Sequence, residues 1–192
     1  MILAPNLAGF VHGFGLRDSE YPAGILLAKQ IHSNIVLDRP GDGDALISNT
    51  ALVGIKTADC VPVLLADPVT NSVAAIHAGW RGTVADIVGQ AVRALGQRWQ
   101  TRPEDIHAAI GPCIGPCCYE VGPEVARQFE IERIGKIHLD LPAENERRLR
   151  DAGVRNIWKS GECTFCTGDR FYSYRREREQ AGRMISFVGI AS

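Results

Sequence analysis

The segment VPVLLADPVTNSVAAIH, residues 61–77, decides the fold of this chain. Its two apolar runs, Val61–Leu65 and Val73–Ile76, are almost continuous, whereas a strand with one solvent-exposed face would alternate apolar and polar residues. Such runs are typical of strands that are covered on both faces. The residues between them, 67–71, carry a proline and an asparagine and predict a hairpin-like connection. We therefore expect two consecutive strands, at 61–66 and 72–77, inside a layered domain.

The sequence on either side of this hairpin predicts further strands and helices. Short apolar runs rich in β-branched residues predict strands at 45–48 and 52–57. Further strands are expected at 107–110 and 154–158, and the segments 171–174 and 184–190 are strand-like as well. Thr83 is the expected N-cap of an amphipathic helix over 84–99, and more helices are expected at 123–130 and 142–152. Because strands and helices interleave without a strict βαβ rhythm, we expect an α+β (mixed α/β) fold. It would be one layered domain over residues 1–192, with mixed β-sheets flanked by helices.

Composition excludes several classes of protein. At 192 residues, with 45% hydrophobic and 22% charged residues, the chain fits one soluble globular domain. A net charge of −1 gives no general attraction to nucleic acid or to an anionic membrane. No stretch of the sequence approaches the roughly 20 apolar residues of a membrane-spanning helix, and residues 1–6 do not resemble a signal peptide. We expect a cytoplasmic protein that binds neither nucleic acid nor membrane, and the sequence leaves its oligomeric state open.

Three possible metal ligands, His32, Cys60 and His77, stand in strings of unusual composition. These strings are KQIHS at 29–33, TADCVP at 57–62 and AIHAGWRG at 75–82. Two imidazoles and one thiolate form a ligand set that Zn²⁺ accepts, and three protein ligands with one open position are typical of catalytic zinc. The three residues are far apart in sequence, so the fold would have to bring them together at the ends of strands. The alternative for each histidine is a place in the core without a metal.

Six strings together resemble those of the multicopper polyphenol oxidase (laccase-domain) family, which includes the bacterial peptidoglycan editing factor. Besides the three above, the matching strings are DALIS at 44–48, IGPCIGPCCYEVG at 110–122, and CT at 163–164 followed by FYSYRR at 171–176 and GR at 182–183. They occur in order over about residues 30–190. Members of this family are described as zinc-dependent purine nucleoside phosphorylases with adenosine deaminase activity.

The resemblance implies a metal centre, a fold and a class of substrate. The family's ligands fall on His32, Cys60 and His77, with Zn²⁺ as the expected metal and Cu²⁺ as a substitute. A mixed α/β fold is implied as well. The implied partners are small molecules, namely phosphate and a purine nucleoside such as adenosine, inosine or methylthioadenosine. Residues 11–18 keep only the glycine and arginine character of the family's usual N-terminal string, which leaves the range of substrates open.

Other residues are candidates for catalysis and substrate binding. Asp59 adjoins the thiolate, where it would shuttle protons, orient a ligand histidine or make only a structural pair. Arg81 lies in a glycine-flanked turn before a helix and is a candidate phosphate ligand, with a surface salt bridge as the alternative. The remaining candidate substrate contacts are Gln30, Tyr174 and Arg175. We expect Trp80 in the core, and Arg178 and Arg183 on a solvated face.

The other five cysteines are expected to be free thiols that bind no metal. Disulfide scaffolds are mostly short secreted chains, which this chain does not resemble. Cys113, Cys117 and Cys118 lie in a Gly/Pro-rich turn and are expected to be mostly buried and inert. Cys163-x-x-Cys166 would suit a redox pair or half a zinc ribbon, but no βαβ context surrounds it.

The sequence leaves rival functions open and excludes one. A multicopper laccase needs many imidazole ligands, and this chain has five histidines and no His-x-His pair, so that function is excluded. A single bound copper with polyphenol oxidase-like activity is one alternative. A metal-dependent hydrolase that edits peptidoglycan precursors is another, and a non-catalytic binding domain is a third.

Overall fold

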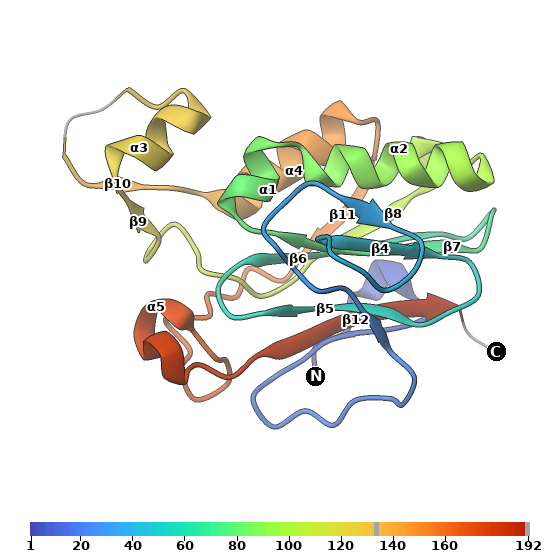
Figure 1. Ribbon diagram of the computed structural model, residues 1–192, viewed down its shortest axis with the longest axis horizontal. Helices are drawn as coiled ribbons and strands as arrows, with labels where there is room; N and C mark the ends of the chain where they lie inside the picture. The colour runs from blue at the N-terminus through green and yellow to red at the C-terminus, as the bar shows by residue number, and fades with distance from the viewer. Residues whose placement is uncertain (133–134, 191–192) are drawn as a thin grey trace.

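The computed structural model describes residues 1–132 and 135–190. Within these residues the chain forms three layers (Figure 1). Helices cover one face of a six-stranded sheet, and a four-stranded sheet covers its other face. A two-stranded ribbon, β9 (Glu120–Val121) with β10 (Ile137–His138), extends to one side together with α3 (Pro123–Ala126). The predicted α+β fold is confirmed.

The six-stranded sheet is mixed, with the strand order β11-β8-β6-β7-β4-β3. In chain order its strands are β3 (Val36–Leu37), β4 (Ala45–Ser48), β6 (Val61–Asp67), β7 (Ser72–Ala78), β8 (His107–Ile110) and β11 (Asn156–Lys159). β6 is antiparallel to both neighbours, whereas β3–β4 and β8–β11 are parallel pairs. In the β6–β7 hairpin, Pro62 lies opposite His77 and Asp67 lies opposite Ser72. This register places the residues just before β6 beside the end of β7.

The second sheet has the strand order β1-β12-β5-β2. Its strands are β1 (Phe10–Phe14), β2 (Leu26–Leu27), β5 (Val53–Thr57) and β12 (Met184–Ile190). β12 is antiparallel to both β1 and β5, so the last strand lies in the middle of the sheet. β5 leads directly into the residues before β6 and thereby joins the two sheets at one end.

Alternate residues of β6 belong to different hydrophobic cores. Val61, Val63 and Leu65 pack with the helical layer, whereas Leu64 and Ala66 pack with the second sheet. Burying a side chain of this size contributes about 1.5–3 kcal/mol to folding. Burial on both faces explains the continuous apolar run at 61–65, and the prediction of a strand covered on both faces is confirmed.

The helices over the six-stranded sheet are α1 (Trp80–Val84), α2 (Ile87–Trp99) and α4 (Leu141–Asp151), and α5 (Tyr174–Glu177) lies apart from them (Figure 1). Short 3₁₀ turns occur at Pro5–Leu7, Pro103–Asp105, Arg127–Phe129 and Arg178–Gln180. The helix predicted at 123–130 is α3 with the 3₁₀ turn that follows it. None of the helices in the described part of the chain combines the length and apolarity needed to span a membrane.

The helix predicted over 84–99 is two helices, so that prediction is wrong at its start. Helical structure begins at Trp80, and Asp86, in the left-handed conformation with φ of 60°, separates α1 from α2. Thr83 is therefore not an N-cap. It is buried inside α1, where its Oγ1 accepts a hydrogen bond of 3.0 Å from Asn145 of α4. The Thr83 side chain does accept a hydrogen bond, as an N-cap would, but the donor is a side chain of another helix rather than the backbone of its own helix.

The strand predicted at 171–174 is absent. Phe171 and Ser173 are buried while Tyr174 is exposed, which imitates the alternation of a strand. Phe171 N instead donates to Thr167 O in a turn, and Ser173 Oγ accepts from Arg176 N at the start of α5. The other strands and helices begin or end within two residues of their predicted bounds at 45–48, 52–57, 61–66, 72–77, 107–110, 142–152, 154–158 and 184–190.

Candidate functional site

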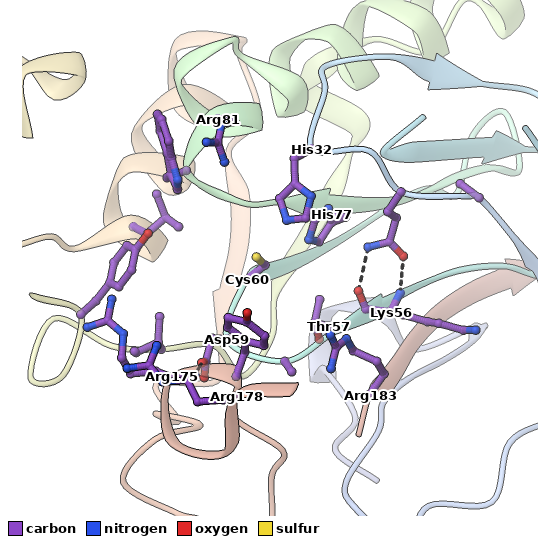
Figure 2. Close-up of a pocket in the computed structure, with 18 of the residues that line it drawn as sticks. His32, Lys56, Thr57, Asp59, Cys60, His77, Arg81, Arg175, Arg178 and Arg183 are labelled. Carbon is purple, nitrogen blue, oxygen red and sulfur yellow. Dashed lines mark hydrogen bonds between the residues drawn. The ribbon is translucent and has the colours of Figure 1, made fainter. Parts of the chain in front are cut away.

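His32, Cys60 and His77 converge on one point, as predicted. One donor atom from each lies within 4.8 Å of the other two, and Figure 2 shows the three side chains facing one another. Cys60 directly precedes β6, and His77 lies near the end of β7, so the hairpin register brings them together. His32 comes from the loop before β3, and its ring lies 4.9 Å from that of His77 between centroids. The structure thus joins three segments at the end of one hairpin.

A buried carboxylate, Asp44, holds the two histidines in place. Its Oδ1 lies 2.7 Å from His77 Nδ1, which leaves His77 Nε2 free for a metal. The same carboxylate accepts hydrogen bonds from the backbone N–H groups of Ile31, His32 and Ser33. A carboxylate behind a ligand histidine fixes its tautomer and orientation in metal sites. The sequence analysis includes Asp44 only as the first residue of DALIS. A histidine that binds a metal usually has a carboxylate partner, and that requirement is the signal that points to Asp44.

Two backbone conformations at the site are strained. His32 has φ of 60° and Asp59 has φ of 86°, and neither is glycine. Such residues cost about 1–3 kcal/mol each and occur preferentially at functional sites. The hydrogen bond that the backbone N–H of His32 donates to Asp44 helps to maintain the first of them. The strain therefore falls on a metal-ligand candidate and on the neighbour of another.

Gly79 keeps the space beside the three donors open. A Cβ at this position would lie 3.2 Å from His32 Cδ2 and 3.3 Å from Cys60 Sγ, closer than side chains ordinarily approach. Gly79 is also the N-cap of α1, with extended backbone. The first glycine of AIHAGWRG, Gly79, is thus explained by the close approach of two candidate ligands. The donor set and this open space fit a metal ion with three protein ligands.

The electrostatics of the cluster favour a thiolate. Burial would raise the pKa of Cys60, but hydrogen bonds from His32 and His77 outweigh it and lower the pKa to about 6. Burial would lower the pKa of His77, yet its bonds to Asp44 and Cys60 raise it to about 9. Asp44 loses part of its hydration, but hydrogen bonds from His77 and Ser33 hold its pKa well below the ordinary value. A metal ligand must be deprotonated, and Cys60 is already disposed to be so.

The three donors lie in the wall of a cavity of about 770 Å³. This volume is within the range of small-molecule sites, about 300–1,000 Å³. The other predicted site residues also line it, namely Gln30, Asp59, Arg81, Tyr174 and Arg175. Trp80 is half-buried and packs against the core, as expected, but it also lines the cavity. Arg178 and Arg183 are exposed, as expected, and they too lie in the cavity wall (Figure 2). Lys56 and Tyr119 were missed, although Tyr119 lies in the quoted string IGPCIGPCCYEVG.

Asp59 is held by the C-terminal part of the chain. Its Oδ1 accepts from Thr164 Oγ1 at 2.6 Å, and its Oδ2 accepts from Ser173 Oγ at 3.0 Å and from Arg175 N at 2.6 Å. It contacts neither ligand histidine by a hydrogen bond, so Asp44 has the orienting role that was one of the alternatives for Asp59. The contacts explain why CT and FYSYRR accompany TADC in this sequence.

The remaining predicted contacts have their own partners. Gln30 pairs through both ends of its amide with the backbone of Lys56, at 2.7 and 2.8 Å (Figure 2). Tyr174 donates its hydroxyl hydrogen to Glu179. Arg175 lies over the ring of Tyr119, and Arg81 lies 4.4 Å from the ring centre of Trp80. Gln30 thus fixes the cavity wall, while the arginines are supported by aromatic rings.

Known proteins resemble this chain in sequence and in fold. Residues 8–191 match the family described as multi-copper polyphenol oxidoreductase laccase. The chain is 45% identical over 175 residues to a purine nucleoside phosphorylase of Deinococcus radiodurans, covering 84% of this chain and 68% of that protein. It is 38% identical over 198 residues to a purine nucleoside phosphorylase of Clostridium acetobutylicum, covering 95% of this chain and 81% of the relative. The crystal structure of YlmD from Geobacillus stearothermophilus has a TM-score of 0.89 at 28% identity, over 98% of this chain and 94% of that one.

Proposed function

Because this chain belongs to the multi-copper polyphenol oxidoreductase laccase family, as its motifs predicted, we propose that it is a zinc-dependent purine nucleoside phosphorylase that also deaminates adenosine. Relatives that carry the name purine nucleoside phosphorylase support an enzyme of that general kind. The single observation that carries the proposal is the convergence of His32, Cys60 and His77 in the wall of a cavity rich in arginine.

The proposed metal ligands are these three residues. Zn²⁺ accepts nitrogen and sulfur donors, and Asp44 and Gly79 supply the orientation and the space that such a centre needs. A zinc ion held there would act as a Lewis acid, which can lower the pKa of bound water to about 7. Copper would compete for the same donors, so metal analysis is part of the test.

Phosphate is the proposed ligand of the basic side chains. Arg81, Arg175, Arg178, Arg183 and Lys56 all line the cavity. Guanidinium groups bind phosphate oxygens through paired hydrogen bonds. In phosphorolysis a phosphate oxygen bonds to the anomeric carbon, the glycosidic bond breaks, and the purine nitrogen takes a proton. Arg81 and its neighbours would hold the incoming phosphate, and Tyr119 and Trp80 offer apolar faces to the purine. We assign Gln30, Tyr174 and Arg175 to the substrate-binding wall.

Asp59 is the proposed proton-transfer residue. It is the only carboxylate among the described residues that line the cavity. Hydrogen bonds from Thr164, Ser173 and the Arg175 backbone fix its position. Transfer of a proton by a positioned carboxyl group contributes about 10²–10⁴-fold to rate. Both reactions need such a transfer, at the purine nitrogen in phosphorolysis and at the departing amine in deamination.

The test combines metal analysis with product analysis. The purified protein is expected to hold zinc at the three-ligand centre, to convert inosine and phosphate into hypoxanthine and ribose 1-phosphate, and to convert adenosine into inosine without phosphate. Cys60→Ala is expected to lose that zinc and both activities while the circular dichroism spectrum is retained. Full activity in Cys60→Ala, or neither product from the zinc-loaded protein, would contradict the proposal.

A further inference from the structure

Four cysteines form a second cluster, outside the cavity. The sulfur atoms of Cys117, Cys118, Cys163 and Cys166 all lie within 4.8 Å of one another. Cys166 Sγ lies 3.6 Å from Cys117 Sγ and 3.4 Å from Cys118 Sγ. All four are free thiols, as expected. The expectation of burial in the Gly/Pro-rich turn is wrong for Cys117, which is exposed, as is Cys166.

The spacing of the sulfur atoms suits a shared metal ion. A tetrahedral zinc with four bonds of about 2.3 Å places its sulfur ligands about 3.8 Å apart. The contacts of Cys166 Sγ with Cys117 Sγ and Cys118 Sγ, at 3.6 and 3.4 Å, are close to that value and far above the disulfide bond length of about 2.05 Å. Four thiolates with no other donor are the ligand set of structural zinc sites.

A tight turn allows adjacent cysteines to serve one site. Cys117 and Cys118 would point in opposite directions on an extended chain, as neighbouring residues do in a strand. In the structure Cys118 N and Tyr119 N both donate to Gly115 O, at 3.0 and 2.9 Å, so the chain curls around Gly115. A Cβ on Gly115 would lie 3.4 Å from both Cys117 Sγ and Cys163 Cβ. These are ordinary contact distances, so the turn packs directly against the loop that carries the other two cysteines.

The Cys163-x-x-Cys166 loop resembles half of a zinc-binding ribbon. Gly115 N donates to Cys163 Sγ at 3.3 Å, which favours the thiolate over the thiol. Arg176 binds the carbonyl oxygens of Thr164 and Phe165, at 3.0 and 2.9 Å. Four thiolates and one Zn²⁺ would carry a net charge of −2, and this guanidinium on the loop would offset part of it. The backbone geometry and the local charge thus both suit a thiolate-bound cation.

We propose that Cys117, Cys118, Cys163 and Cys166 form a structural zinc site that ties together two walls of the cavity. Thr164, within the second loop, holds Asp59, and Tyr119, directly after Cys118, lines the cavity. The metal would fix both loops without contacting substrate. This site is independent of the centre formed by His32, Cys60 and His77.

Native mass spectrometry and elemental analysis of the reduced, zinc-loaded protein test this proposal. The expected content is two zinc ions per chain. Cys118→Ser/Cys166→Ser is expected to bind one, and His77→Ala is also expected to bind one. The zinc that remains in the double variant is expected at the centre formed by His32, Cys60 and His77, so the lost ion is assigned to the four-cysteine site. Cys113→Ala is the matched control, since Cys113 is buried beside the loops but lies outside the cluster. It is expected to retain both ions.

Cobalt provides a second readout that uses the unaltered protein, in case a variant does not fold. Loading with Co²⁺ is expected to give thiolate-to-metal charge-transfer absorption that rises in two steps, with the larger step belonging to the four-thiolate site. One zinc per chain in the unaltered protein, with these four cysteines recovered as alkylated thiols or as disulfides, would overturn the proposal.

Discussion

Asp44 Oδ1 lies 2.7 Å from His77 Nδ1, and both side chains are almost completely buried. This contact joins β7 to the loop that carries His32, because the same carboxylate accepts hydrogen bonds from the backbone of residues 31–33. One carboxylate therefore positions two of the three candidate metal ligands.

Replacing Asp44 by Asn should weaken metal binding while all three ligands remain. The amide removes the charge behind His77 and one acceptor of the loop, and loss of such partners typically costs 10–100-fold in metal affinity. Competition with a chromogenic zinc chelator measures this change. Asp42→Asn, which alters an exposed carboxylate near the same loop, is the control and should leave affinity unchanged. Equal affinities for the two variants would show that Asp44 does not support the ligands.

Metal-free protein should have an unusually acidic Cys60. The pKa of this thiol is lowered to about 6, so its thiolate should persist as pH falls until about pH 6 and should be protonated below it. An ordinary cysteine, with a pKa of about 8.5, is mostly protonated there. The alkylation rate of the Cys60 peptide, followed by mass spectrometry against pH, measures the midpoint. His77→Gln should move the midpoint upward, because it removes a hydrogen bond to the thiolate. A midpoint above pH 8 in the unaltered protein would contradict this prediction.

A methyl group on Gly79 should disturb the metal centre. The Cβ would press on His32 and Cys60, at 3.2 and 3.3 Å, so Gly79→Ala should lower zinc affinity with little effect on the rest of the fold. Isothermal titration of metal-free protein with Zn²⁺ gives the affinity. Gly41→Ala is the matched control, since the nearest atom to its Cβ is at an ordinary 3.6 Å. If Gly79→Ala and Gly41→Ala bound zinc equally well, the space beside the donors would not matter.

Arg81→Ala should separate the two proposed activities. Loss of a hydrogen bond to a charged group costs about 1.5–3 kcal/mol, or roughly 10–150-fold. We expect KM for phosphate to rise by that order, while deamination of adenosine, which uses water, should persist. Steady-state kinetics with varied phosphate measures the effect, and Arg93→Ala, on the exposed side of α2, serves as the control. A parallel loss of both activities would assign Arg81 to nucleoside positioning or to structure.

Much of the candidate site could be predicted because its candidate metal ligands lie within short strings. His32, Cys60 and His77 were identified from these strings alone, and the hairpin that joins two of them could be predicted from its apolar runs. Contacts between segments distant in sequence could not be predicted. Asp44 behind His77, and Thr164 and Ser173 around Asp59, depend on how loops fold back onto the sheets.

The errors in the fold have a similar cause. The aromatic residues of 171–174 favour a strand, but the segment turns into α5, where Ser173 is the N-cap. Asp86 adopts a left-handed conformation that interrupts a helical pattern, and nothing in the apolar spacing of residues 84–99 reports it. The cysteine cluster was missed because Cys117 and Cys118 share a side only when Gly115 turns the chain.

Pro62 lies opposite His77 in the β6–β7 hairpin, so the position of His77 beside Cys60 depends on the strand register that the turn at the other end sets. A slip of one residue between β6 and β7 would turn every side chain of one strand to the other face, and His77 would leave Cys60. Asp67 holds the turn by accepting hydrogen bonds from Val69 N and Thr70 Oγ1, at 2.8 and 2.6 Å. Metal binding by this chain would therefore report the native register of the β6–β7 hairpin, because only molecules with that register bring the three candidate ligands together.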